Sequence, residues 1–354
     1  MSDKYYDHQH GIEYNEWEYP IRRFGCIPSS VQAERAFALG VKSDEQKIAE
    51  LAAPWDKSDQ PAIIQWNEDW KKMLEEQAEA FDKLRDEGLL PPIWEMAEAL
   101  KLNLQELCLS LQLINDCAAW AVMRAFICRA IIQAYFGNEI DIEKINPSGL
   151  YTFSSGETPR DWERVPDNGR TIYAVAESAC KTGNFPASAI GAYTGDARFT
   201  PLMIKSVKIA NENQLGFVYV GSKSAEELAD IVLLSLRAGK PVVIGNSVAL
   251  RDGTHQSADG VYVSDVNGSW GGGHATAAVD VKKVGDRYYP FIYNSHGKRY
   301  NAPDGRPAEG TYITREGLVR YLSGSFADIM PTTYAERPRV EYYDLYNFGR
   351  KKNG

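Results

Sequence analysis

The segment from Ala118 to Phe136 constrains the fold most, because its residues are apolar on almost every side of a helix. Arg124 and Arg129 interrupt it, so we predict a buried helix and not a membrane span. Asp116 suits the N-cap of this helix, which puts Cys117 in the first turn. A helix without a polar face has to lie at the centre of a domain.

Helical patterns come first in the chain and strand patterns follow. The predicted helices cover 63–88, about 92–112, 117–136, 171–182 and 225–238, the last opened by a capping box, and residues 145–215 are otherwise expected to be loops. The predicted strands are 217–220, 242–245, 261–263, 275–284 and 287–293. This order indicates an α+β fold.

We expect three parts along the chain. Residues 1–100 form an N-terminal extension, an irregular arm followed by helices; residues 101–330 form the main domain, and residues 331–354 form a C-terminal tail. The ends, 1–60 and 331–354, are rich in aromatic residues and proline and cannot bury a core of their own. We expect them to be extended arms that hold protein partners or a second copy of the chain.

Composition excludes several classes of protein. Hydrophobic residues make up 44% of the 354, which supports a large core, and the net charge of −9 argues against a partner that is nucleic acid or an anionic membrane. The first twenty residues contain no apolar stretch of the kind found in signal peptides, so we expect a cytoplasmic protein. Five cysteines without regular spacing are then expected to be reduced thiols.

Three residues far apart in the chain suggest nucleophilic catalysis. Cys117, at a helix N-terminus, is placed where the helix dipole favours a thiolate. His274 follows three glycines at the start of a strand pattern, and Asn294 ends the next strand, so a hairpin would bring Asn294 level with His274. Gln112, five residues before the thiol, could donate an N–H to an oxyanion. Cys108, Cys128 and Cys180 are interpreted as small buried hydrophobes.

The sequence lacks the common signatures of metal and cofactor sites. It contains no CxxC, no HExxH, no phosphate-binding loop and no dinucleotide fingerprint. We therefore expect neither a metal nor a cofactor.

These segments resemble the papain-like cysteine peptidase family over about residues 105–325. The resemblance is carried by Gln112–Ala121, by Asp167–Pro186, by Leu236–Gly245, and by Gly273–Val281 together with Tyr293–Gly297. It implies a two-lobe fold, with a central-helix lobe and an antiparallel β-barrel-like lobe, and a substrate cleft between them. It also implies that Cys117 is the nucleophile, His274 the base, Asn294 the orienting residue and Gln112 the oxyanion donor.

The chain departs from the family pattern in three places. Gln112 is one residue closer to the cysteine, and His296 stands where the family has a tryptophan that shields the Asn–His contact. In the family a tryptophan directly follows the nucleophile, whereas here Ala118 and Ala119 precede Trp120. If Trp120 is the equivalent residue, the nucleophile position is Ala119 and the protein is inactive.

Three functions remain open from the sequence. The first is a cysteine peptidase-type hydrolase acting on peptide or protein substrates. The alternative is a catalytically weak or inactive papain-like scaffold with a structural or assembly role, for example as a virion component. The third is a cell-wall amidase or peptidoglycan endopeptidase, which the long interval between Cys117 and His274 fits less well.

Overall fold

The computed structural model describes residues 4–7, 12–15, 63–109, 111–136, 142, 144–156, 162–200, 203, 216–324 and 327–332. Most of the two expected arms, 1–60 and 331–354, therefore lies outside the described residues. Within the N-terminal one, β1 (Lys4–Asp7) and β2 (Ile12–Asn15) form an antiparallel pair.

The main part follows the order of helices and then strands. Its helices are α3 (Glu68–Asp86), α4 (Ile93–Ala99), α5 (Leu104–Cys108), α6 (Cys117–Tyr135), α7 (Pro147–Phe153), α8 (Ile172–Thr182), α9 (Ala187–Ile190), α12 (Ala225–Arg237) and α13 (Arg315–Tyr321). Its strands are β3 (Ile63–Gln65), β4 (Phe217–Tyr219), β5 (Val242–Leu250), β6 (His255–Gln256), β7 (Tyr262–Val263), β8 (Val266–Val284), β9 (Arg287–Tyr293), β10 (Gly310–Tyr312) and β11 (Ala327–Pro331). The predicted α+β fold is confirmed.

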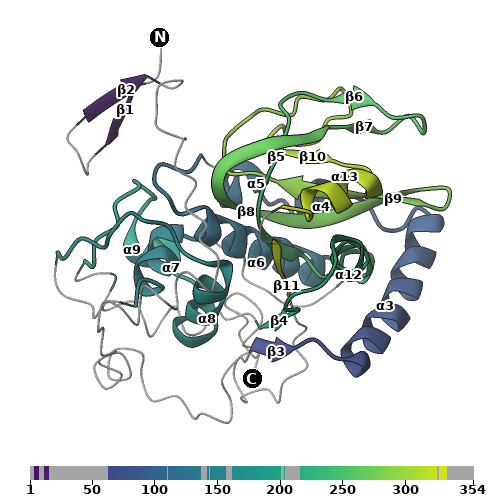
Figure 1. Ribbon diagram of the computed structural model, residues 1–354, viewed down its shortest axis with the longest axis horizontal. Helices are drawn as coiled ribbons and strands as arrows, with labels where there is room; N and C mark the ends of the chain where they lie inside the picture. The colour runs from purple at the N-terminus through teal and green to yellow at the C-terminus, as the bar shows by residue number, and fades with distance from the viewer. Residues whose placement is uncertain are drawn as a thin grey trace.

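Helix α6 lies at the centre of the molecule, with α7, α8 and α9 on one side and the large sheet on the other (Figure 1). Every residue from Cys117 to Gln133 is buried, including both arginines. By length and composition α6 alone among the described helices could cross a membrane, but 94% of its most apolar window is buried inside the protein. The prediction of a buried central helix is confirmed.

The large sheet has the order β11-β5-β8-β9-β10-β7-β6, and its central pairs are antiparallel. Strand β8 is long and strongly curved (Figure 1). Side chains alternate between the faces of the sheet, so Ala277, Val279 and Tyr293 join the core around α6. Ala278 and Ile292 join a second core with α12 and α13.

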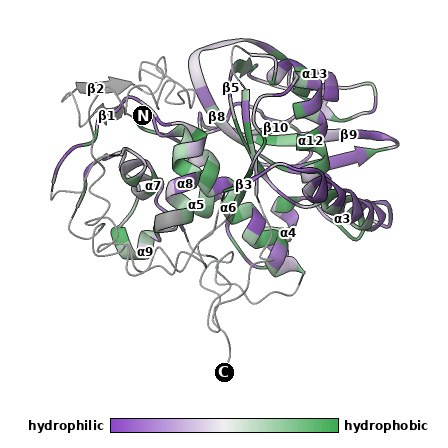
Figure 2. Cartoon of the chain, turned by 60° about the horizontal axis from the view of Figure 1, so that its bottom comes forward, coloured by the Kyte–Doolittle hydropathy of each residue, from purple (hydrophilic) through white to green (hydrophobic). Residues whose placement is uncertain are grey.

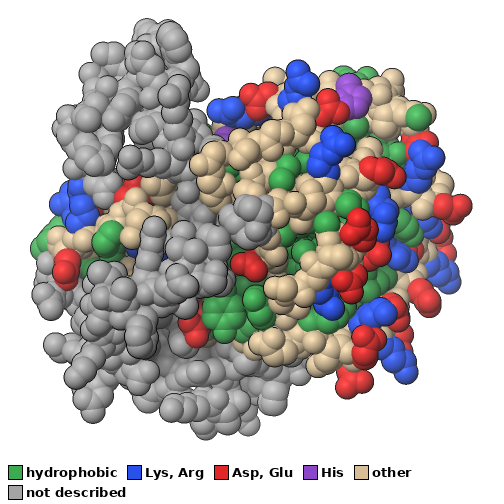
Figure 3. All heavy atoms as spheres, viewed as in Figure 1, with side chains coloured by type: hydrophobic (Ala, Val, Ile, Leu, Met, Phe, Trp, Pro, Cys, Tyr) green, Lys and Arg blue, Asp and Glu red, His purple; other side chains and the backbone are tan. Residues whose placement is uncertain are grey.

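Helix α3 covers the outer side of the β-rich half. It is mostly hydrophilic (Figure 2) and buries a narrow stripe of Trp70, Leu74 and Ala78 toward α12. Asp82 accepts hydrogen bonds from Arg85, Arg237 and Tyr288, and this network fixes α3 to α12 and β9. On the face seen in Figure 3, acidic and basic side chains are interspersed over this half of the molecule.

Three helix predictions needed correction. The first helix begins at Glu68 and not at residue 63, because Ile63–Gln65 pairs with β4 and Asn67 caps the helix. The stretch 92–112 is two helices, because Asn103 caps a new helix after a break at Lys101, whose φ is +60°. The expected loops contain α7 and α9, of which α7 begins with the cap Asn146 and a proline.

Candidate active site

His274 and Asn294 form a buried pair. The predicted hairpin of β8 and β9 brings them together, and His274 Nε2 lies 2.9 Å from Asn294 Oδ1. Both side chains are fully buried. Asn294 Nδ2 donates to the Tyr300 hydroxyl at 2.8 Å, and the Asn294 backbone N–H donates to the Glu309 carbonyl at 2.9 Å. Asn294 is therefore held from three directions and can hold the imidazole in turn.

These contacts determine which nitrogen of His274 carries the proton. Because Asn294 Nδ2 donates to Tyr300, its Oδ1 is the atom that faces the ring, and Nε2–H has to donate to it. Nδ1 is then the basic nitrogen of the neutral ring. Burial lowers the pKa of His274 to about 4, with the Asn294 hydrogen bond opposing the shift and the charge of Arg124 adding to it. The ring is therefore neutral and able to accept a proton at pH 7.

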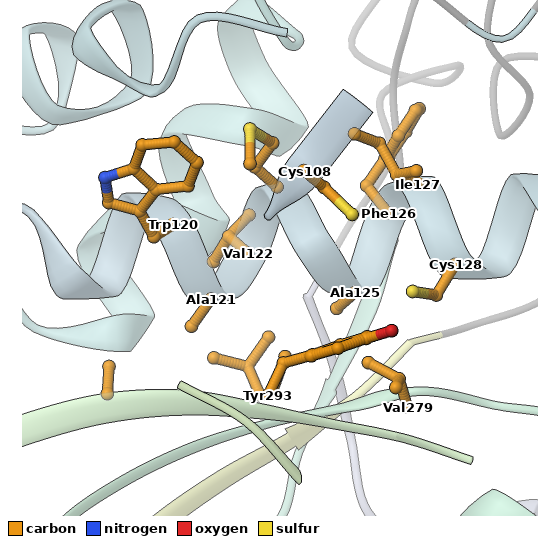
Figure 4. Close-up of a cluster of buried hydrophobic side chains, with 14 of the residues drawn as sticks. Cys108, Trp120, Ala121, Val122, Ala125, Phe126, Ile127, Cys128, Val279 and Tyr293 are labelled. Carbon is orange, nitrogen blue, oxygen red and sulfur yellow. The ribbon is translucent and has the colours of Figure 1, made fainter. Parts of the chain in front are cut away.

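Cys117 is the first residue of α6, as the sequence predicted, and it is buried. Figure 4 shows Ala121, Ala125 and Cys128 on the side of α6 that faces Tyr293 and Val279 of the sheet. Cys117 precedes Ala121 by four residues, so the two share one side of the helix. Ala119 lies about 160° around the helix axis from Ala121 and is on the opposite side.

Trp120 belongs to the other side of α6. Its ring packs edge-on against Tyr193 at 5.0 Å between centroids, and the Arg124 guanidinium lies 5.1 Å from the Trp120 ring centre. The sheet-facing position at the start of the helix is thus Cys117 and not Ala119.

Cys117 at the start of α6 and Ala275, which directly follows His274 on β8, belong to the same buried core. In Figure 4, α6 runs from Ala121 to Cys128 in the same direction as the sheet runs from Tyr293 to Val279. Tyr293 pairs with Ala277, so β8 ascends along the helix from residue 277 to residue 279.

Gln112 joins the loop before Cys117 to the segment after Asn294. Its backbone N–H donates to the Ser295 carbonyl at 2.9 Å, and the Ser295 hydroxyl donates to Gln112 Oε1. Gln112 Nε2 donates to the Ile114 carbonyl at 2.9 Å. One of the two side-chain N–H groups is therefore engaged locally.

As predicted, Asp116 occupies the N-cap of α6, although its side chain makes no capping hydrogen bond. Both carboxyl oxygens are buried, and the neighbouring Tyr193 hydroxyl lowers the pKa of the Asp116 carboxyl in opposition to its burial. Burial raises the pKa of Asp116 well above its ordinary value, which favours the neutral carboxyl. A neutral carboxyl does not oppose a thiolate at Cys117.

Sequence reasoning missed two residues of the site. Tyr300 orients Asn294 from six residues further along the chain, and burial raises its pKa to about 12, so its hydroxyl keeps its proton. Trp270 lies against His274, with ring centroids 4.7 Å apart. Neither has a signal in the sequence, because one comes from an irregular loop and the other depends on an irregularity in β8.

The described part of the chain also bears on the expectations for metals, cysteines and cavities. The described residues hold no cluster of three or more metal-ligating side chains. Cys108, Cys117, Cys128 and Cys180 are buried reduced thiols. A cavity of about 540 Å³ lies between the β6–β7 and β8–β9 hairpins and the start of α13, and none of the four candidate residues lines it.

Comparisons with known proteins give matches among solved structures. A scan of protein-family models and a search of curated proteins returned no match. Xylellain, a cysteine protease from Xylella fastidiosa, matches with TM-score 0.42 and 18% identity over 64% of this chain and 82% of its own. The Carica candamarcensis cysteine protease CMS1MS2 matches with TM-score 0.39 and 15% identity over 64% of this chain and 93% of its own.

Procathepsin B from Trypanosoma congolense matches with TM-score 0.42 and 11% identity over 88% of this chain and 100% of its own. These proteins are papain-like cysteine proteases, the family that the sequence motifs resemble. The likeness concerns the fold alone.

Proposed function

We propose that the protein is a cysteine peptidase-type hydrolase that transfers an acyl group from a peptide or protein substrate to Cys117 and then to water. The observation that carries this proposal is the buried hydrogen bond from His274 to Asn294, with Asn294 itself anchored by Tyr300. An imidazole fixed in one tautomer is what thiol catalysis requires of its base.

Each residue has a distinct task in the proposed reaction. His274 Nδ1 accepts the thiol proton while Cys117 Sγ bonds to the substrate carbonyl carbon. Asn294 keeps the proton on Nε2 and stabilises the imidazolium that forms. His274 then gives its proton to the leaving amine, and the acyl thioester remains on Cys117. A water molecule, deprotonated by the same nitrogen, releases the acid and restores the thiol.

The first turn of α6 supports both charged species of this reaction. N–H groups there point out of the helix end, and the helix dipole places partial positive charge at the same point. They stabilise a thiolate at Cys117 and the oxyanion of the tetrahedral intermediate. In this proposal the remaining side-chain N–H of Gln112 assists them, and its backbone bond to Ser295 keeps it near the histidine segment.

Access to the site requires a local opening. Cys117 and His274 have no exposed surface in this structure. A carbonyl carbon has to come within about 3–3.5 Å of the sulfur to react. We therefore expect the wild-type protein to convert slowly to an open, reactive form. Mildly denaturing conditions should accelerate the alkylation of Cys117.

The test is the capture of the covalent intermediate. Wild-type protein, Cys117→Ala and Cys128→Ala are incubated with pooled acylated peptide esters, quenched in acid and measured by intact-protein mass spectrometry. Cys128 is the matched control because it is a buried thiol on the same side of α6. The proposal requires an acyl adduct on wild type and on Cys128→Ala, mapped to Cys117. An adduct that persists in Cys117→Ala, or no adduct on any protein, contradicts it.

The other functions receive no further support from the described residues. The assembly role, including that of a virion component, depended on residues 1–60 and 331–354, which lie largely outside the described part of the chain. The cell-wall amidase would use the same thiol and imidazole, so digestion of purified peptidoglycan separates it from a peptidase.

A further inference from the structure

The ring of His274 is enclosed by two aromatic side chains. Trp270 lies against it at 4.7 Å between centroids with the planes inclined by 58°, and His296 stacks on it at 4.3 Å with an angle of 27°. Trp270 and His296 also touch each other edge-on at 5.2 Å. The three rings therefore form one closed cluster.

The cluster excludes water from His274. Trp270 is 9% exposed, His296 is 4% exposed, and His274 has no exposed surface. Burial lowers the pKa of His296 well below its ordinary value, and the electrostatic interaction with the adjacent His274 ring adds to the shift, so His296 packs as a neutral ring. Neutral aromatic rings on the imidazole restrict its rotation and keep water from the hydrogen bond to Asn294.

The position of Trp270 is unexpected from its place in the chain. It precedes His274 by four residues on β8, and four residues of a regular strand span about 13 Å. The two rings would lie well apart if β8 were regular. Their contact at 4.7 Å therefore requires an irregularity between them.

The register of β8 against β5 shows this irregularity. Between the pairs Asn246–His274 and Val248–Ser269, β5 advances by two residues while β8 advances by five. The surplus residues form a large bulge, a device that redirects side chains next to active sites. Gly271 lies in the bulge with φ of +75°, a conformation that other residues rarely adopt. The bulge folds Trp270 back onto His274.

We propose that Trp270 is a positioning residue for His274, placed by the glycine bulge of β8 so that its indole closes the His274–Asn294 hydrogen bond to water. It contacts the base and not the substrate. This inference rests on the proposed function for its catalytic meaning, whereas the contact itself is measurable without any reaction of Cys117.

The first measurement uses the wild-type chain. In protein with ¹⁵N,¹³C-labelled histidine and tryptophan, the His274 ring protons should show cross-relaxation with the Trp270 indole, and the nitrogen shifts should report a proton on Nε2. No cross-relaxation between these rings overturns the proposal, even if every Trp270 variant fails to fold.

The second measurement is the solvent exchange of the His274 Nε2–H. Trp270→Ala should accelerate exchange by about 2- to 10-fold, the factor that corresponds to the ~0.5–1.5 kcal/mol of one aromatic pair. Trp270→Phe should restore most of the protection, and Gly271→Ala should accelerate exchange because it disturbs the bulge. Trp162→Ala is the matched control, since Trp162 is 64% exposed and outside the cluster. Equal exchange in wild type and folded Trp270→Ala overturns the proposal.

The two proposals fail separately. Fast exchange in Trp270→Ala together with an inert Cys117 would mean that Trp270 positions the base of an inactive site. A reactive Cys117 together with unchanged exchange would mean that the hydrolase proposal holds and that Trp270 has only a packing role.

Discussion

The burial of His274 predicts a specific acid sensitivity of the folded protein. Burial lowers the pKa of His274 to about 4, whereas its ordinary value of 6.5 applies to the unfolded chain. The unfolded chain therefore binds a proton first as the pH falls. His274 leaves stability unchanged above pH 6.5 and destabilises the fold progressively between 6.5 and 4.

The size of the effect follows from these two pKa values. When the pH falls below both pKa values, the titration of His274 lowers the free energy of unfolding by about 3 kcal/mol. Between pH 7.5 and pH 5 it lowers the free energy of unfolding by about 2 kcal/mol. His274→Gln removes the titration. From pH 7.5 to pH 5, the free energy of unfolding of the variant should therefore decrease by about 2 kcal/mol less than that of wild type. This difference does not depend on the stability of the variant at pH 7.5.

Urea unfolding at pH 7.5 and pH 5 measures this difference. Other buried groups such as Asp116 and Asp280 titrate in both proteins, so their contributions cancel in the comparison. His255→Gln serves as control, because that side chain is 56% exposed, and it should follow wild type. Equal pH dependence in wild type and His274→Gln would refute the reasoning, as would wild-type stability that rises toward pH 5. Either result would mean that burial does not lower the pKa of His274 in the folded protein.

Three further perturbations separate the site from the rest of the fold. In urea unfolding, Asp116→Asn should gain stability relative to wild type as the pH rises from 4 to 7. Burial raises the pKa of Asp116, so the unfolded wild-type chain releases that proton first and wild type loses stability. A stability difference that stays constant with pH would contradict this. Tyr300→Phe removes the hydroxyl that accepts the hydrogen bond from Asn294 Nδ2. The free energy of unfolding should decrease by about 1–3 kcal/mol, and alkylation of Cys117 at pH 6 should slow. An unchanged alkylation rate would exclude an orienting role for Tyr300. Ser224→Ala removes a capping-box residue of α12 and should lower the free energy of unfolding by about 1 kcal/mol. The alkylation rate of Cys117 should not change. A changed rate would mean that any loss of stability, even far from the site, alters the reactivity of Cys117.

The elements that could be predicted from the sequence are those with local signals. The apolar segment after Asp116 gave α6 with its start at Cys117, and the capping box gave the start of α12. The Gly285-Asp286 turn and the alternation after it gave β9 with its observed bounds, from Arg287 to Tyr293. Each of these features depends on residues within a few positions of one another.

The features that could not be predicted depend on contacts between distant segments. Ile63–Gln65 is a strand only because β4 lies beside it. Asp116 lies at the N-cap of α6, but its buried side chain does not bond to the N–H groups of the helix. The contact of Trp270 with His274 depends on a bulge that is defined only against the register of β5. No periodicity in the sequence carries such information.

The most direct test of the central claim is the pH dependence of Cys117 alkylation by iodoacetamide, read by mass spectrometry in wild type and in His274→Ala. A Cys117 paired with His274 should react below pH 7, faster than Cys108, Cys128 and Cys180, and His274→Ala should abolish that reactivity. A Cys117 that reacts like the other buried thiols in both proteins would contradict the account.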